Sequence, residues 1–122
     1  MKLMKVQLAA SDALLANQYS YIDMESIVDI SPISATLVIS TTSGALTFTF
    51  DGDDAAEKLL NASKMANYIA PRIIEYVGGK PKKDTTIFNL LGDQTIAELH
   101  TATGIVHTSG SANTALISIV AS

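Results

Sequence analysis

The sequence predicts a small, mostly β protein of the α+β class, with a strongly bent antiparallel sheet and one main helix. Two observations carry this prediction. In residues 35–50, apolar residues alternate with threonine and serine, which is the two-residue period of a strand. In residues 55–77, apolar residues recur about every 3.6 positions, which is typical of an amphipathic helix lying on a core.

The alternating run at residues 35–50 predicts a β-hairpin. Ser43 and Gly44 interrupt it where the chain would turn, and Gly44 is expected to supply the positive φ of a tight turn. The predicted core residues are Leu37, Ile39, Leu46, Phe48 and Phe50. The opposite faces carry threonine and serine instead of charges, and such faces do little to repel another protein surface. We therefore expect burial against a neighbour, with a solvated face as the alternative.

The N-terminal third predicts further strands. Residues 2–9 alternate, with Met4, Val6 and Leu8 on one face. Residues 11–18 favour a single helical turn capped by Ser11 or residue 12, although the pattern leaves this segment ambiguous. Residues 19–31 alternate again. Pro32 is expected to end that run or to bend it, because proline has no N–H to donate to a strand ladder.

The one convincing helix begins after the acidic run at residues 51–54. Asp54 and Glu57 have the spacing of a capping box, and acids suit the positive end of a helix dipole. Pro71 is expected to kink the helix or restart it near Ala70, and Gly78 with Gly79 to end it. The predicted core positions are Leu59, Ala62, Ala66, Ile69, Ile73 and Val77.

The C-terminal part predicts a loop at residues 80–84 and then more strands. Residues 85–91 fit a strand or a short helix equally well, so the fold of residues 85–95 stays open. Residues 97–108 predict a strand broken at Gly104, and residues 109–113 predict a turn. A final strand is expected over residues 115–121.

Composition favours a single domain over residues 1–122 that hides part of its surface. Charged residues make up 16% of the chain, against about 25% in typical proteins, whereas hydrophobic residues make up 48%. An interface explains this imbalance, and extensive use of serine and threonine on the surface is the competing explanation. Because there are no cysteines, disulfides, thiolate metal sites and cysteine catalysis are excluded. The net charge of −4 argues against a uniformly basic nucleic-acid binder.

Targeting signals are not evident. The apolar residues near the N-terminus are interrupted by Lys5 and Gln7, and the run is too short for a signal peptide. No window approaches the roughly 18 apolar residues of a membrane span. We expect a cytoplasmic protein without a membrane partner.

Chemistry-bearing motifs are weak, so the sequence predicts neither an enzyme, nor a metal site, nor a cofactor. His100 and His107 lie on opposite faces if they share a strand, and no carboxylate or cysteine cluster accompanies them. The acidic run at residues 51–54 resembles the start of a calcium loop but lacks its later ligands, and helix capping explains it better. Neither a phosphate-binding loop nor a serine nucleophile elbow is present.

One basic cluster stands out in this acidic chain. Lys80, Lys82 and Lys83 are three of the eight basic residues, and Arg72 precedes them by about two helical turns. These four residues are the candidate nucleic-acid contacts, and a solvated loop tip is the alternative. A ring of copies would repeat the cluster around an axis and strengthen its potential.

Residues 21–32 and 34–50, followed by the helix start at 51–54, resemble short proteins of marine cyanophages and the Sm-like family. Gly44 and Phe50 with Asp51 stand for that family's hairpin glycine and Phe-Asp pair, at a shorter spacing. Ser109 with Gly110 stands for its late Arg-Gly, without the arginine. The resemblance covers roughly residues 19–51 and 96–121.

This resemblance implies a bent sheet that forms an open barrel, with the helix at about residues 54–77 as an insertion. It also implies a homo-oligomeric ring of roughly five to seven copies, and RNA or single-stranded DNA as a partner in the host cytoplasm. We expect a ring-forming phage protein with a role in nucleic-acid processing. The alternative is a virion structural or assembly protein that self-associates without nucleic acid.

Overall fold

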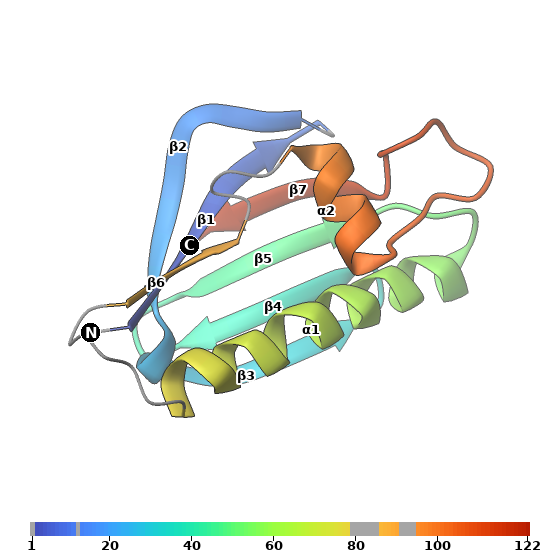
Figure 1. Ribbon diagram of the computed structural model, residues 1–122. Coiled ribbons are helices and arrows are strands. Elements are labelled where there is room, and N and C mark those ends of the chain that lie inside the picture. Colours follow the sequence, from blue (N-terminus) through green and yellow to red (C-terminus); the bar gives the residue numbers. More distant parts are fainter. Residues whose placement is uncertain (1, 12, 79–85, 91–94) are drawn as a thin grey trace.

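The computed structural model describes residues 2–11, 13–78, 86–90 and 95–122, and it confirms the α+β class (Figure 1). A single sheet carries both helices on one face, and α1 contacts β3, β4 and β5 there. In chain order the elements are β1 (Lys2–Ala10), β2 (Ala13–Asp23), the short 3-10 helix η1 (Met24–Ser26), β3 (Ile27–Ile33), β4 (Thr36–Thr41), β5 (Ala45–Phe50), α1 (Ala55–Gly78), β6 (Thr86–Leu90), α2 (Ile96–Thr103) and β7 (Leu116–Ala121).

The sheet has seven strands. Six of them follow the antiparallel order β2-β1-β7-β5-β4-β3, and β6 pairs with β1 in parallel. β2 is strongly bent (Figure 1), and Asn17 within it has a φ of 59°. Over the described residues the sheet ends at β2 on one side and at β3 on the other, without closing into a barrel. The bent antiparallel sheet is therefore present, and a parallel strand is added to it.

The predicted hairpin is confirmed. β4 and β5 pair with Leu37 opposite Phe48 and with Ile39 opposite Leu46, and all four side chains are fully buried. The rings of Phe48 and Phe50 stack with their centroids 6.5 Å apart. The alternating pattern identified the core face of these two strands correctly, because a period of two admits only one buried face.

Gly44 does not play its expected part in the hairpin turn. Its φ is not positive, and Gly104 is the one glycine in the described part of the chain with that conformation. Instead, a Cβ added at Gly44 would overlap with the backbone carbonyl oxygen of Ser122. Glycine is needed there because the segment after β7 runs against the turn, where Ala45 and Ser122 exchange backbone hydrogen bonds.

β1 agrees with its prediction up to Val6, and Met4 and Val6 are fully buried. The pairing with β2 then shifts register between Gln7 and Ala9, so that Ala9 is buried in place of the expected Leu8. Among residues 11 and 13–18, which the structure describes, there is no helical turn. Most of them belong to β2, because pairing with the end of β1 satisfies their backbone, and local propensity could not reveal this partner.

Pro32 lies inside β3 and does not end it. It pairs with Leu37 of β4, and β3 is the last strand on its side of the sheet in the described residues. An edge strand leaves one set of N–H groups outside the ladder, so proline costs it no hydrogen bond.

α1 is continuous from Ala55 to Gly78, so of the kink or restart expected near Ala70 the restart is wrong. Pro71 and Asn67, whose carbonyl loses its helical partner, are both on the exposed side, where water can replace the missing bond. At the end of the helix, the ammonium group of Lys2 donates to the carbonyl of Val77 (2.7 Å), which suits the negative end of the dipole.

The buried face of α1 differs from the predicted one at three positions. Leu59 is 42% exposed, whereas Asn61 and Met65 are fully buried. The other predicted core positions are buried or partly buried and pack against the sheet. None of the helices in the described ranges has both the length and the apolar character needed to cross a membrane.

The strand expected over residues 97–108 is wrong, because this segment contains α2. The Thr95 hydroxyl caps the helix by accepting from the N–H of Glu98, and the Glu98 carboxylate accepts in turn from the N–H of Thr95. Gly104 ends the helix with a φ of 76°. This Thr-x-x-Glu spacing is visible in the sequence and was the missed signal. Further back, β6 shows a strand over residues 86–90 of the ambiguous segment, and residues 85 and 91–94 lie outside the described residues.

Candidate functional site

The sheet has an open face, on the side away from α1, across β3, β4, β5 and β7. Because alternate residues of these strands are buried under the helices, the residues between them point the other way. Register places them in rows, such as Ser31, Val38, Thr47 and Val120. The open face consists of Asp29, Ser31, Ile33, Thr36, Val38, Ser40, Ala45, Thr47, Thr49, Ser118 and Val120.

This open face is almost free of charge. Asp29 is its one charged residue within these four strands, and the Ser31 hydroxyl donates a hydrogen bond to its carboxylate. Ile33 and Val120 are 61% and 53% exposed. A nearly neutral surface with exposed apolar side chains can accept another protein surface with little desolvation of charge.

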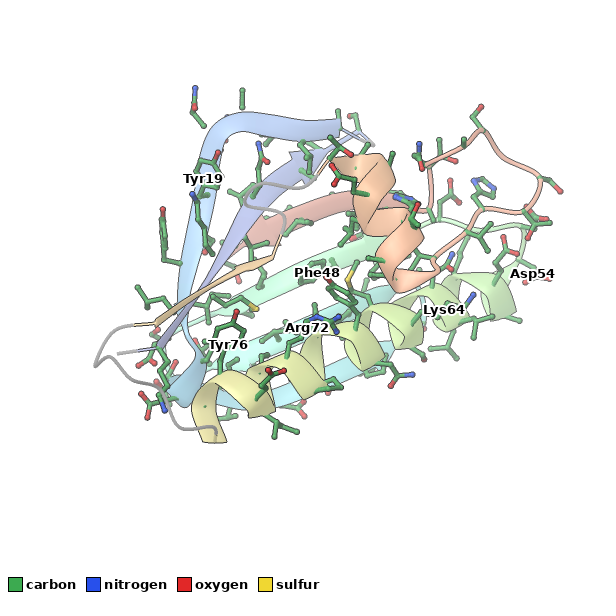
Figure 2. The ribbon with its side chains drawn as sticks, in the orientation of Figure 1. Tyr19, Phe48, Asp54, Lys64, Arg72 and Tyr76 are labelled. Atoms are coloured by element: carbon green, nitrogen blue, oxygen red, sulfur yellow. The ribbon has the colours of Figure 1, made fainter. Side chains whose placement is uncertain are left out.

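A second polar arrangement lies where α1 begins, beside the loop between α2 and β7 (Figure 2). The Glu57 carboxylate accepts from the backbone N–H of Thr108 (3.0 Å) and from its hydroxyl. Asp53 likewise accepts from the N–H and the hydroxyl of Ser109 (2.9 and 2.8 Å). The hydrogen bonds from Thr108, followed by that from the N–H of Asp53, lower the pKa of Glu57 to about 2. These contacts hold the loop against the helix.

Asn61 fixes the same loop from inside. Its amide donates to the carbonyls of Asp51 and Val106 (2.9 and 2.8 Å), and its oxygen accepts from the N–H of Val106 (3.0 Å). Lys64, one turn further along α1, donates to the carbonyl of Gly104 (3.0 Å). The sequence analysis missed Asn61. The available signal was an amide standing among the apolar positions of an amphipathic helix.

His107 belongs to this arrangement, and His100 does not. The ring nitrogens of His107 lie 3.8 Å from a carboxylate oxygen of Asp51 and 3.5 Å from one of Asp53, and Nδ1 is 3.3 Å from the Thr114 hydroxyl. Within the described ranges, no group of three histidine, cysteine or acidic side chains is placed to hold a metal. The cluster is a structural clamp that joins the loop to the start of α1.

His100 is a buried structural histidine in α2. Its Nδ1 lies 2.8 Å from the carbonyl of Ile96, and its Nε2 accepts from the N–H of Ala115 (3.1 Å). This geometry requires a neutral ring protonated at Nδ1, because a carbonyl accepts only and an N–H donates only. The two histidines were expected on opposite faces of one strand. They lie instead in a helix and in a loop, because residues 97–108 are not a strand.

Of the predicted basic cluster, only Arg72 lies within the described residues. Its guanidinium lies 3.7 Å from the centre of the Tyr68 ring and donates to the Tyr68 carbonyl (2.7 Å), so the side chain is held against α1 (Figure 2). Lys80, Lys82 and Lys83 lie outside the described residues. The structure therefore does not bring these four residues together into a described site.

A different cation, Lys5, lies on β1, on the side of the strand opposite the buried Met4 and Val6. Lys5 pairs across from Tyr21 and holds its ammonium 4.3 Å from the centre of the Tyr19 ring, one diagonal position away. Tyr21 is 54% exposed. The sequence analysis did not single out these residues, because their alignment depends on the register between the two strands.

Comparisons with protein-family models, with curated proteins and with solved structures found no match to this chain.

Proposed function

We propose that this protein is a self-associating structural or assembly module whose open face packs against a second copy of the chain. The observation that carries the proposal is the neutrality of that face over β3, β4, β5 and β7. Two copies that meet through it place no like charges opposite each other apart from Asp29, although the whole chain has a net charge of −4.

Two further features support this reading. Ile33 and Val120 gain burial at such an interface, and each fully buried aliphatic side chain is worth about 1.5–3 kcal/mol. The low charge content of the chain is also explained if part of the surface is normally covered. Packing of the open face on itself gives a two-fold pair. The closed ring implied by the Sm-like resemblance would need a further contact, between the sheet edges that β2 and β3 leave in the described residues.

The test measures molar mass by light scattering after size exclusion, at micromolar protein concentration. The native chain should elute as an oligomer, and Thr47→Lys combined with Val120→Lys should shift it to the monomer, because two cations per copy would be buried. Ala112→Lys, on the exposed loop before β7, is the matched control and should leave the mass unchanged. A native chain with the mass of a monomer would overturn the proposal.

A second candidate function is nucleic-acid binding, which the clustering of Lys80, Lys82 and Lys83 in the sequence favours. We propose fluorescence anisotropy with labelled single-stranded RNA and DNA at two salt concentrations. Binding should weaken as salt rises, and the triple Lys→Ala variant should have a smaller salt slope, by roughly one for each phosphate that a lysine neutralises. An Arg72→Ala variant tests whether the guanidinium leaves Tyr68 to contribute.

No binding by the native chain at low salt would exclude this second function. Binding that survives the triple change would keep nucleic acid as the ligand and move the contact surface elsewhere.

A further inference from the structure

A cavity of about 360 Å³ lies at one end of the sheet, where it borders the open face at Ala45 and is separate from the clamp. The end of β2, the turn between β4 and β5, and the C-terminus meet there, on the left of Figure 1. Its volume falls in the range of small-molecule pockets, roughly 300–1,000 Å³. Tyr21, Asp23, Ser26, Ala45 and Ser122 are among the lining residues.

Three of the hydroxyl groups around the cavity are committed as donors. The Ser26 hydroxyl donates to the carbonyl of Asp23 (2.8 Å), that of Thr41 to the carbonyl of Gly44 (3.1 Å), and that of Ser122 to the carbonyl of Ala45 (3.4 Å). A hydroxyl has one proton and two lone pairs, so Ser26 and Ser122 can offer a ligand only acceptor sites. Thr41 also accepts from two backbone N–H groups, which leaves it little further capacity.

Asp23 gives the cavity a negative charge that no described side chain neutralises. Its Oδ1 accepts from the N–H of Glu25 (3.0 Å), where it caps the short helix η1. Among the described residues, neither lysine nor arginine lines the cavity or forms an ion pair with Asp23. On the neighbouring strand β1, the Lys5 ammonium is held over the Tyr19 ring and the Lys2 ammonium donates to the carbonyl of Val77. A carboxylate whose second oxygen has capacity to accept therefore faces a space rich in acceptors.

Tyr21 adds an aromatic wall to the same space. Its side chain is 54% exposed and lines the cavity beside Asp23. An aromatic face attracts a cation and also packs against the methylene groups that carry it. Leu3, Ala45 and Ala121 supply apolar surface for such a stem.

We propose that this cavity binds a primary alkylammonium group, with the ammonium on Asp23 and on the acceptor oxygens of Ser26 and Ser122, and the alkyl stem along Tyr21. An ammonium has three donors and no acceptor, which is the complement of a site that offers acceptors and one negative charge. The Asp23 carboxylate would repel an anion, and it would offer no proton to an uncharged acceptor. The same chemistry is found in a free diamine and in a lysine side chain.

The test is a titration followed by backbone amide NMR, using cadaverine in one arm and Nα-acetyl-lysine methylamide in the other. Saturable shifts should be confined to the amides that line the cavity, notably Ser26, Gly44 and Ala45. Tighter binding of the blocked lysine than of cadaverine indicates a lysine side chain as the source, and the reverse order indicates a free amine. The Nε-acetylated form of the blocked lysine, which carries no charge, should not bind.

Asp23→Asn is the decisive variant, because asparagine retains the capping oxygen for Glu25 while removing the charge. It should weaken binding about tenfold, which is typical for the loss of a charge-assisted contact. Asp29→Asn is the matched control, since it removes the same charge from an exposed strand residue and should leave the affinity unchanged. Tyr21→Leu should weaken binding while leaving the cavity apolar.

Equal losses in the Asp23 and Asp29 variants, or shifts spread over all acidic residues, would show non-specific attraction to the acidic chain and would overturn the proposal. No shift in either arm would overturn it as well. Self-association is measured by the molar mass of each variant, so a failure of the alkylammonium site is distinguishable from a failure of the proposed oligomer.

Discussion

Glu57, in the first turn of α1, holds Thr108 through both its backbone N–H and its hydroxyl, across 51 residues of chain. The contact joins the start of the long helix to the loop that precedes β7. It explains how an irregular loop acquires a fixed position without a disulfide, and it makes the stability of this region sensitive to the charge of one carboxylate.

That sensitivity predicts a defined pH dependence. The pKa of Glu57 falls from its ordinary value of 4.5 to about 2 in the folded protein. Below pH 4.5 Glu57 becomes protonated in the unfolded chain while it stays ionised in the folded chain. The stabilisation is therefore complete above pH 4.5 and is lost as the pH falls to about 2. Urea unfolding from about pH 7 to about pH 2 should show this decline. Glu57→Gln should remove the part of the decline that belongs to Glu57, and an unchanged profile would contradict the assignment.

Phe48 and Thr47 test the two faces of β5. Phe48→Ala should cost about 3–5 kcal/mol in free energy of unfolding, because the side chain is fully buried and stacks near Phe50. Thr47→Ala, on the open face, should cost little in the monomer. If the open face is an interface, Thr47→Ala should instead alter the dimerisation or ring equilibrium. Equal, small losses at both positions in urea titrations would contradict the strand phase.

Gly44 tests the close approach of the C-terminal segment. Gly44→Ala places a methyl group against the Ser122 carbonyl oxygen, closer than van der Waals contact allows, so backbone must move. Such overpacking typically costs about 1–3 kcal/mol. The control is Gly78→Ala, at the end of α1, where an added Cβ meets nothing within 4 Å. This change should stabilise the protein slightly, because alanine favours a helix over glycine. Thermal unfolding of the two variants should therefore shift in opposite directions.

Asn61 tests the internal attachment of the loop. Asn61→Ala leaves the N–H and carbonyl of Val106 and the carbonyl of Asp51 without their partner, and it leaves a cavity in a fully buried position. We expect a loss of about 2–4 kcal/mol in the free energy of unfolding. Asn67→Ala, on the exposed side of the same helix, should change it by less than about 0.5 kcal/mol. Faster hydrogen exchange at Val106 in the Asn61 variant would locate the effect, whereas equal stabilities would contradict it.

The sequence by itself determined the elements whose signal is periodic and local. The hairpin of β4 and β5 alternates strictly, so the burial of Leu37 and Phe48 followed from the pattern. The acidic start of α1 followed from Asp54, whose carboxylate accepts from the N–H of Glu57 (2.9 Å). The capping box of Thr95 and Glu98 also marks the start of α2 in the sequence, although residues 97–108 were predicted to form a strand.

Tertiary structure decided the features that depend on distant partners. β2 is a strand because β1 lies beside it, and Pro32 is tolerated because β3 is an edge. Gly44 is constrained by Ser122, and Asn61 is satisfied by Val106. The open face and the Tyr21–Asp23 cavity likewise arise only when separate strands come into register. No local pattern encodes these relationships, because each depends on a hydrogen bond or a close contact between residues that are far apart in the chain.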